Sequence, residues 1–309
     1  MTITADERAA LETAEHRLRA ILPEEYQDSY EDVQPVSMGS AGLKYGADGK
    51  VAWNEMWATF CDLAMAGGPP HKGTLLEPAP RAAIDAHPHL YAEVVEEICR
   101  GVTLVTGLPA RESTTPGWIR VFCRSGGMAG WLVRAIVMEN VSARHEGPAL
   151  ELPAGPRYRV EKEIKNVITV IAKTAHYWTG HMWNAEQRFI ADLFSNMAAE
   201  SPLIEPAFPA SPEDVARCAA LSAMMAGRLA RDTGLRAAAD RYAGWFGVEC
   251  ASVRAAVWMM RTLVASNVLA RREGTVLFVP VNPSLDPDGS RTVQALARVH
   301  RFAVERGVS

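Results

Sequence analysis

The sequence has few cysteines, no long apolar run and no large excess of either charge. No C-x-x-C pair occurs among its five widely spaced cysteines, so we expect neither a disulfide framework nor a tetrathiolate zinc site. No stretch approaches about 18 uncharged apolar residues, which argues against a membrane span. Lys and Arg number 32 against 36 Asp and Glu, and the net charge of -4 argues against nucleic acid or an anionic membrane as the main partner.

Signals for targeting and for common cofactors are also missing. The first residues contain no basic segment followed by an apolar run, so we expect no secretory signal and a cytoplasmic location. The sequence has no Walker loop, no G-x-G-x-x-G after a strand, no H-E-x-x-H and no cysteine cluster for an iron–sulfur centre. The cofactor is therefore unknown, no metal site is expected, and no family is recognised.

An internal repeat is the most informative feature that is present. Residues 117–156 align with residues 244–283 at a constant offset of 127, without a gap, and 18 of the 40 positions are identical. The same offset matches Thr106-Gly107-Leu108 to Thr233-Gly234-Leu235. Two copies exclude a solenoid. They predict an internal duplication with pseudo-two-fold symmetry, because two like units can bury matching apolar faces on one another.

Each copy is predicted to be an α-β-α-β-β-α unit within an α/β or α+β fold. Glycines 107 and 234 stand where a helix is expected to end, and Ser211-Pro212 is a typical helix start. Serines 125 and 252 are placed to cap the middle helix. The turn at Glu146-Gly147 lies between two alternating runs and predicts a β-hairpin. The alternative is a continuing helix followed by one strand.

Three parts of the chain are expected. Residues 1–85 form a mainly helical N-terminal extension that begins with a capping box at Thr4 and Glu7, and a second apolar helix is expected near Val51 to Ala66. Residues 86–200 form the first unit, which ends in a long connecting helix at about 161–197. Residues 201–309 form the second unit, which opens with a proline-rich link.

The connecting helix carries the strongest candidate site. An apolar stripe runs along one side, and roughly the opposite side carries Lys165, Thr169, Lys173, His176, Gly180 and Trp183. Tyr177 and His181 border that side. We predict a pocket in which His176 or His181 is the general acid or base, Tyr177 assists and Lys173 binds an anion. The alternatives are a solvated face or a subunit contact. Metal binding is disfavoured, because residues five apart lie about 140° apart on a regular helix.

A glycine- and proline-rich loop at residues 66–74 is the second candidate. Gly67, Gly68, His71 and Lys72 combine exposed backbone amides with one cation, a combination that can bind phosphate or carboxylate. The order Lys-Gly-Thr excludes a Walker loop. The alternative is an ordinary loop that terminates a helix.

A third candidate is the junction Cys123-Arg-Ser-Gly-Gly, between a strand and a helix. It resembles over about four residues the active loop of rhodanese-type sulfurtransferases, a resemblance that implies a reactive thiolate at a helix N-terminus. The alternative is a buried cysteine followed by a helix cap. Gly126 and Gly127 are absent from the second copy, and glycines at a helix start admit close approach of a ligand.

Residues kept in both copies are expected to hold the shared fold, with an arginine across the unit or an asparagine at a helix end. Binding between the two halves is the alternative, with Arg134 as a ligand contact. These pairs are Arg134/Arg261, Asn140/Asn267 and Arg144/Arg271.

The sequence favours a cytoplasmic enzyme that acts on a small anionic metabolite near the connecting helix and the 66–74 loop. The alternative is a non-catalytic accessory or assembly protein that uses the aromatic helix face as an interface, as in a homodimer. Sulfurtransferase-like chemistry at Cys123 is a minor alternative. Neither nucleic acid nor a membrane is an expected partner.

Overall fold

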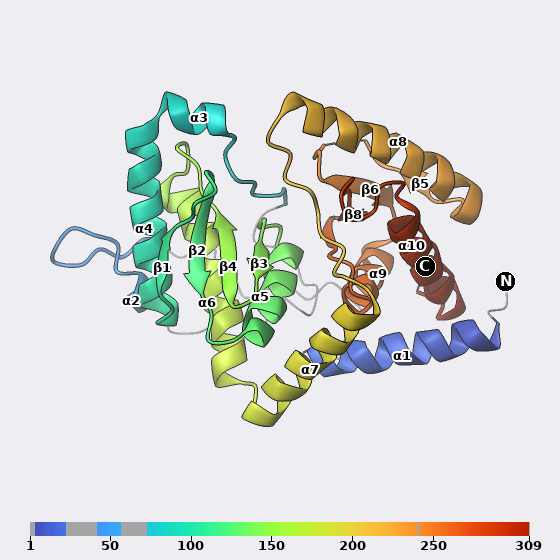
Figure 1. The fold of residues 1–309 in the computed structure, drawn as a ribbon. Coiled ribbons are helices and arrows are strands. Elements are labelled where there is room, and N and C mark those ends of the chain that lie inside the picture. Colours follow the sequence, from blue (N-terminus) through green and yellow to red (C-terminus); the bar gives the residue numbers. More distant parts are fainter. Residues whose placement is uncertain (1–3, 23–41, 57–72, 240, 309) are drawn as a thin grey trace. The chain divides into compact units, whose positions relative to one another are not determined.

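The computed structural model describes residues 4–22, 42–56, 73–239 and 241–308. They form a mixed α/β fold that divides into two compact units (Figure 1). We call Gln34–Ala64 with Pro69–Asp192 the upstream unit, and Met1–Val33, Met65–Gly68 and Leu193–Ser309 the downstream unit. Each unit contains one four-stranded antiparallel sheet, and each is described separately below.

In the upstream unit, helices come before and after a four-stranded sheet that is built from two pairs of strands. Its sheet has the strand order β1-β2-β4-β3. The elements are α2 (Trp53–Met56), α3 (Arg81–Ala86), α4 (Pro88–Thr106), β1 (Ala110–Glu112), β2 (Trp118–Phe122), α5 (Gly126–Met138), β3 (Arg144–Glu146), β4 (Ala149–Pro153), the π-helical turn η2 (Val160–Ile164), α6 (Lys165–Gly180) and the start of α7 (Asn184–Glu200).

From α8 to α10 the downstream unit repeats the order of helices and strands found from α4 to α6, apart from η2, and its strand order is β5-β6-β8-β7. The helix α1 packs on its central helix α9, and Arg301 and Arg306 form ion pairs with Glu7 and Glu15 of α1. Its elements are α1 (Ala5–Ile21), α8 (Pro212–Thr233), β5 (Arg236–Ala237), β6 (Trp245–Glu249), α9 (Val253–Ala265), β7 (Arg271–Glu273), β8 (Val276–Pro280) and α10 (Ser290–Glu305).

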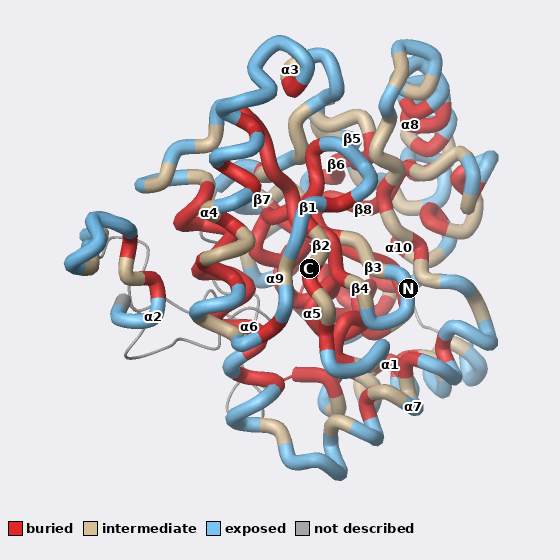
Figure 2. Tube along the Cα trace, turned by 60° about the vertical axis from the view of Figure 1, so that its left-hand side comes forward, coloured by how far each residue is buried: buried red, intermediate tan, exposed pale blue. Residues whose placement is uncertain are grey.

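In each unit two helices contact the sheet, and a third helix contacts both of them. In the upstream unit α4 contacts β1 and β2, α5 contacts β3 and β4, and both helices contact α6; α8, α9 and α10 do the same in the downstream unit. The residues of α5 from Met128 to Met138 are all buried, as are those of α6 from Lys165 to Ala175, so both helices are core elements (Figure 2). Their burial on all sides explains why apolar residues surround α5 instead of forming one stripe.

Local signals in the sequence predicted the helix ends correctly. Thr4 and Glu7 form the expected capping box, and Ser211, Ser125 and Ser252 each accept a hydrogen bond from a backbone N–H of the helix that they start. Gly107 and Gly234 end their helices in the left-handed conformation. Asn140 and Asn267 follow α5 and α9 at φ of 59° and 63°, so this repeated asparagine does end a helix, as expected.

Two predictions about the elements were wrong. The unit contains a strand that the pattern missed, because β1 and β5 are only three and two residues long and are largely exposed. The connecting helix at 161–197 is not continuous. It opens as one π-helical turn, and residues 181–183 separate α6 from α7. Of the apolar helix expected near Val51 to Ala66, the structure describes only α2, and residues 57–66 lie outside the described part.

A further short segment recurs in both units and extends the repeat toward the N-terminus. Residues 75–79 read Leu-Leu-Glu-Pro-Ala and residues 203–207 read Leu-Ile-Glu-Pro-Ala, at an offset of 128. Leu76 forms a parallel bridge with Val141, and Ile204 forms one with Val268. The backbone N–H of Ala79 donates to Ala154, and that of Ala207 donates to Val281. The constant-offset alignment misses this segment because the spacing differs by one residue.

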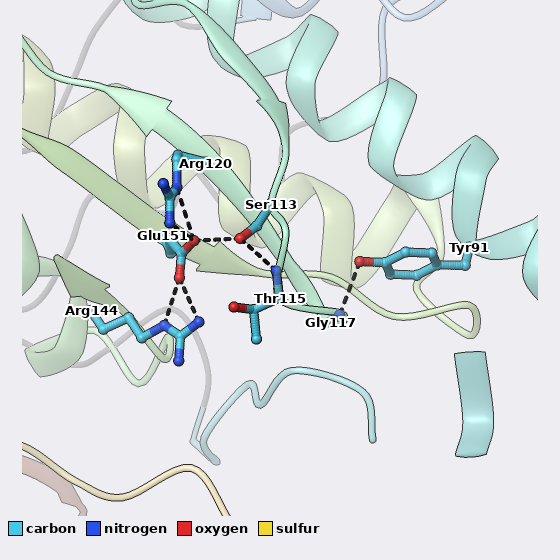
Figure 3. A network of polar contacts seen from close by, with 7 residues as sticks. All are labelled: Tyr91, Ser113, Thr115, Gly117, Arg120, Arg144 and Glu151. Carbon is cyan, nitrogen blue, oxygen red and sulfur yellow. Dashed lines mark hydrogen bonds and ion pairs between the residues drawn. The ribbon is translucent and has the colours of Figure 1, made fainter. Parts of the chain in front are cut away.

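One carboxylate joins all four strands of the upstream sheet (Figure 3). Glu151 of β4 lies between Arg120 of β2 and Arg144 of β3 in the strand register. Arg120 donates to one carboxylate oxygen at 2.9 Å, and Arg144 donates to the other at 2.6 Å. Ser113, directly after β1, also donates its hydroxyl to Glu151. The geometry lets this single carboxylate hold the two edge strands to the centre of the sheet.

In the downstream sheet aromatic rings, and not a central carboxylate, surround the corresponding arginine. Phe278 stands at the position of Glu151, at the offset of 127, and Arg271 stands at that of Arg144. The Arg271 guanidinium lies 4.1 Å from the centre of the Phe278 ring and 5.1 Å from that of Trp245. It also pairs with Glu273 at 2.8 Å. The repeated arginine therefore keeps its place over a tryptophan, as Arg144 does over Trp118, while its polar partner differs.

We predict that Glu151→Gln lowers the free energy of unfolding by about 2 kcal/mol at neutral pH, because buried hydrogen bonds to a charged group are lost. Burial alone raises the pKa of Glu151, but hydrogen bonds from Ser113 and Arg120 and the charge of Arg144 lower it overall. The advantage of the wild type is therefore complete above the unfolded pKa of about 4.3 and is lost as the pH falls through the lower folded pKa. Urea unfolding between pH 7 and pH 3 measures this difference. The exposed Glu146→Gln is the control, and an equal loss in both variants would contradict the prediction.

Candidate functional site

The break between α6 and α7 brings two histidine rings together. His176 lies in the last turn of α6, and His181 is the residue that ends the helix, with φ of -113° and ψ of -24°. The two Nε2 atoms are 3.3 Å apart, and the ring centres are 5.1 Å apart. Both residues are exposed. The expectation that they point about 140° apart was wrong, because it assumed a helix that continues past Gly180.

A stack of three rings fixes the orientation of His181. The Tyr177 ring lies between Trp131 of α5, at 5.6 Å and 15°, and His181, at 5.5 Å and 5°. Trp178 also contacts Trp131, at 6.0 Å between ring centres. Tyr177, Trp178 and Trp131 are buried, so the stack connects an exposed imidazole to the core of the upstream unit. The sequence analysis missed Trp131 as part of this site, although its recurrence as Trp258 marks it as a core position.

Two side chains of α7 hold the turn at the end of α6. The Gln187 side chain donates to the backbone oxygens of Trp178, at 2.8 Å, and Met182, at 3.1 Å. The Glu186 carboxylate accepts from the backbone N–H of Trp183 at 2.7 Å. These bonds satisfy backbone groups that a helix end and a helix start leave open. Gly180 followed by Glu186 and Gln187 was the signal in the sequence that could have shown this break.

Lys173 does not face an open pocket. Its ammonium lies 2.8 Å from a carboxylate oxygen of Glu139, which ends α5, and both side chains are buried. Lys165 and Thr169, expected on the same open face, are buried too, and burial lowers the pKa of Lys165. The prediction of an open polar side was therefore wrong for this part of the helix. Its polar residues belong to the interior, where the Thr169 hydroxyl donates to the backbone carbonyl of Lys165.

The glycines at the start of α5 approach protein atoms. A Cβ added to Gly127 would lie 2.5 Å from the Cβ of Ala191 in α7, so this glycine allows two helices to meet closely. A Cβ at Gly126 would lie 3.7 Å from the nearest atoms, which is an ordinary contact. Arg134 is buried and donates to the Gly130 carbonyl of its own helix at 2.7 Å.

Cys123 is a buried thiol at the end of β2. Burial raises its pKa to about 12, and it does the same for the repeated Cys250. A thiol with that pKa is protonated at neutral pH, whereas a sulfur-transferring cysteine needs a thiolate. This environment gives no support to the sulfurtransferase alternative.

The remaining candidates of the 66–74 loop are not described. Gly67, Gly68, His71 and Lys72 all lie outside the described residues. Of the predicted site, the structure therefore brings together His176, His181 and Tyr177 and places Lys173 in the core. Of the two tryptophans at the end of α6, Trp178 is buried and Trp183 is 78% exposed.

Comparisons with protein family models, with curated proteins and with solved structures all find no match for this chain. Within the described part of the chain, no helix is both long and apolar enough to cross a membrane. Arguments about function therefore depend on the geometry of the described residues.

We predict that Lys173→Met lowers the free energy of unfolding by about 3–5 kcal/mol, because it leaves the buried Glu139 carboxylate without its ammonium partner. The double variant Lys173→Met with Glu139→Leu should recover most of that loss, since an apolar pair removes both buried charges. Denaturant unfolding measures both. A double variant as unstable as the single one would show that the ion pair is not the cause.

We predict opposite effects for alanine at the two glycines of α5. Gly127→Ala should destabilise the protein by about 1–3 kcal/mol, because its methyl group overlaps Ala191. Gly126→Ala should change stability by less than about 1 kcal/mol, and favourably, because alanine is the better helix former. Thermal and urea unfolding compare the two variants. Equal stability of both would remove the packing explanation for Gly127.

Proposed function

We propose that the chain is an enzyme that acts on a small anionic molecule at the His176–His181 pair. The observation that carries this proposal is the 3.3 Å separation of two exposed imidazole nitrogens whose geometry is fixed by the ring stack and the helix corner. Histidine is the side chain best suited to proton transfer near neutral pH. A pair in which one ring donates to the other can accept a proton at one nitrogen while it loses one at the other.

The charge of a protonated imidazole supports the anionic character of the ligand. An imidazolium donates hydrogen bonds from both nitrogens and pairs with carboxylate or phosphate oxygens. Lys173 is not available for this role, because it is paired with Glu139. We therefore revise the proposed mechanism, and the two histidines take both the binding and the proton-transfer roles. The Tyr177 ring acts by positioning His181.

We also infer that the two units derive from duplication of one ancestral unit. The repeated sequence, the common strand order and the shared left-handed asparagines support this inference. A site in one copy is then expected where the copies differ. The histidine pair meets that condition, because α10 contains one histidine, His300, and residues 301–309 contain none. The pseudo-two-fold arrangement of the units stays a prediction.

A cytoplasmic location belongs to the same proposal. Four cysteines fall within the described residues, and all four are free thiols, which is the state expected in a reducing compartment. We therefore place the activity in the cytoplasm.

The alternative function, as a non-catalytic accessory or assembly protein, has one observation in its favour. The exposed Trp183 lies at the corner next to His181, and large exposed aromatic side chains are typical of binding surfaces. Under this alternative Trp183→Ala weakens a complex with a partner or a second copy, and substitution of the histidines has no catalytic effect.

The test begins with a thermal-shift screen of small phosphorylated and carboxylated molecules, in which a ligand at 100 times its Kd adds about 2.7 kcal/mol of stability. For a molecule that is turned over, His176→Gln and His181→Gln should each lower kcat by about 100-fold or more. His89→Gln, at an exposed histidine of α4, is the matched control. Unchanged turnover in the double histidine variant would refute the proposal.

A further inference from the structure

One side of helix α8 is exposed and apolar. The other side contacts α10, β5 and β6 and carries the buried residues of the helix (Figure 1). The exposed side carries two large apolar residues, Val215 and Met224, which are 46% and 47% exposed. Between them lie exposed alanines and one glycine, namely Ala216, Ala219, Ala220, Ala223, Gly227 and Ala230. We call these residues together the α8 face. A helix normally presents charged side chains to water, so an apolar exposed face indicates a binding surface.

The corresponding helix of the upstream unit has a polar face instead. The offset that aligns Gly107 with Gly234 also aligns α4 with α8. Charged residues of α4 stand where α8 has alanine or glycine, and these pairs are Glu93 and Ala220, Glu96 and Ala223, and Arg100 and Gly227. The same place in the fold therefore accepts an ordinary polar helix face. The apolar face is a property of α8 alone, and the architecture of the unit does not require it.

The charges that border the α8 face are complementary to a second copy of the same face. Glu213 lies in the first turn of α8 and Arg231 in the last turn. They are 18 positions apart, which is five full turns, so both lie along the edge that Met224 also occupies. When a two-fold axis relates two antiparallel helices, the same edge of each helix meets its equivalent. Glu213 of one copy then lies opposite Arg231 of the other, and this pair forms twice.

The same register brings the alanines of the two faces together. Its centre is at position 222, so Ala219, Ala220 and Ala223 lie in the middle of the contact, and Ala216 lies near Gly227 of the second copy. Short side chains at a helix contact allow the axes to approach to about 8 Å, the lower end of the usual range. The antiparallel arrangement also places the positive end of each helix dipole beside the negative end of the other.

We propose that the chain forms a homodimer in which the α8 face of one copy packs antiparallel on the α8 face of the other. Apolar surface on both copies is then removed from water. One pair of helices buries less surface than the about 1,200–2,000 Å² of a standard complex, so the dimer should be weak and should dissociate on dilution. This surface differs from the aromatic helix end at Trp183, and the proposal does not depend on the proposed enzyme activity.

The first experiment is sedimentation velocity of the full chain over a range of concentrations up to the millimolar. We expect a monomer–dimer equilibrium. Ala219→Glu should weaken dimerisation by at least about tenfold, because it places an unpaired carboxylate in an apolar contact. Ala92→Glu, at the equivalent exposed alanine of α4, is the matched control and should dimerise like the wild type. Both variants should keep the wild-type urea midpoint, since both positions are exposed. A wild type that stays monomeric, or equal dimerisation of both variants, would overturn the proposal.

Charge reversal tests the antiparallel register. Glu213→Arg and Arg231→Glu should each weaken dimerisation by about threefold to tenfold, because each brings like charges together twice. An equimolar mixture of the two variants should associate like the wild type, since opposite charges then meet at both ends of the mixed dimer. A mixture that associates no better than either variant alone would exclude this pairing. Trp183→Ala should leave dimerisation unchanged, and a loss in that variant would place the interface at the aromatic helix end instead.

Discussion

The packing of α6 against α5 is the contact on which the candidate site depends. Trp131 of α5 stacks on Tyr177 of α6, and Glu139 at the end of α5 pairs with Lys173 in the middle of α6. The first contact supports the ring that stacks on His181, and the second places a buried ion pair in the middle of α6. Because both contacts lie in the interior, the exposed histidines at the end of the helix stand on a rigid base.

The polar side chains of α6 are buried, although their spacing in the sequence predicts an exposed helix face. Lysines and threonines at helical spacing are typical of a solvated face, and here they are enclosed. The buried ammonium of Lys173 is tolerated because a carboxylate lies at hydrogen-bonding distance. The buried hydroxyl of Thr169 is tolerated because it donates a hydrogen bond to a backbone carbonyl. The partner, Glu139, comes from a different helix that is 34 positions earlier in the sequence, so no local rule could identify it.

The two sheets show that one architecture admits different polar interiors. The strand order is the same, and an arginine lies over a tryptophan in both sheets. In the upstream sheet the arginine is bound to a buried carboxylate, and in the downstream sheet it lies among aromatic rings. What is common to both, the backbone path and the helix ends, depends on turns, caps and apolar spacing. The residue opposite the arginine differs between the units, Glu151 in one and Phe278 in the other, and its contacts lie within its own sheet.

The sequence by itself determined the repeat, the helix caps, the asparagines at helix ends and the β-hairpins, because each depends on residues that are close in the chain or on a backbone conformation that few residues adopt. It also pointed to His176, His181 and Tyr177. Only the tertiary structure decided what these residues do together. At the end of α6 the Gln187 side chain of the next helix donates to the Trp178 carbonyl in the last turn and to the Met182 carbonyl just beyond it. That turn, and the stack on Trp131, bring two imidazoles to 3.3 Å, a distance that helical periodicity alone does not predict.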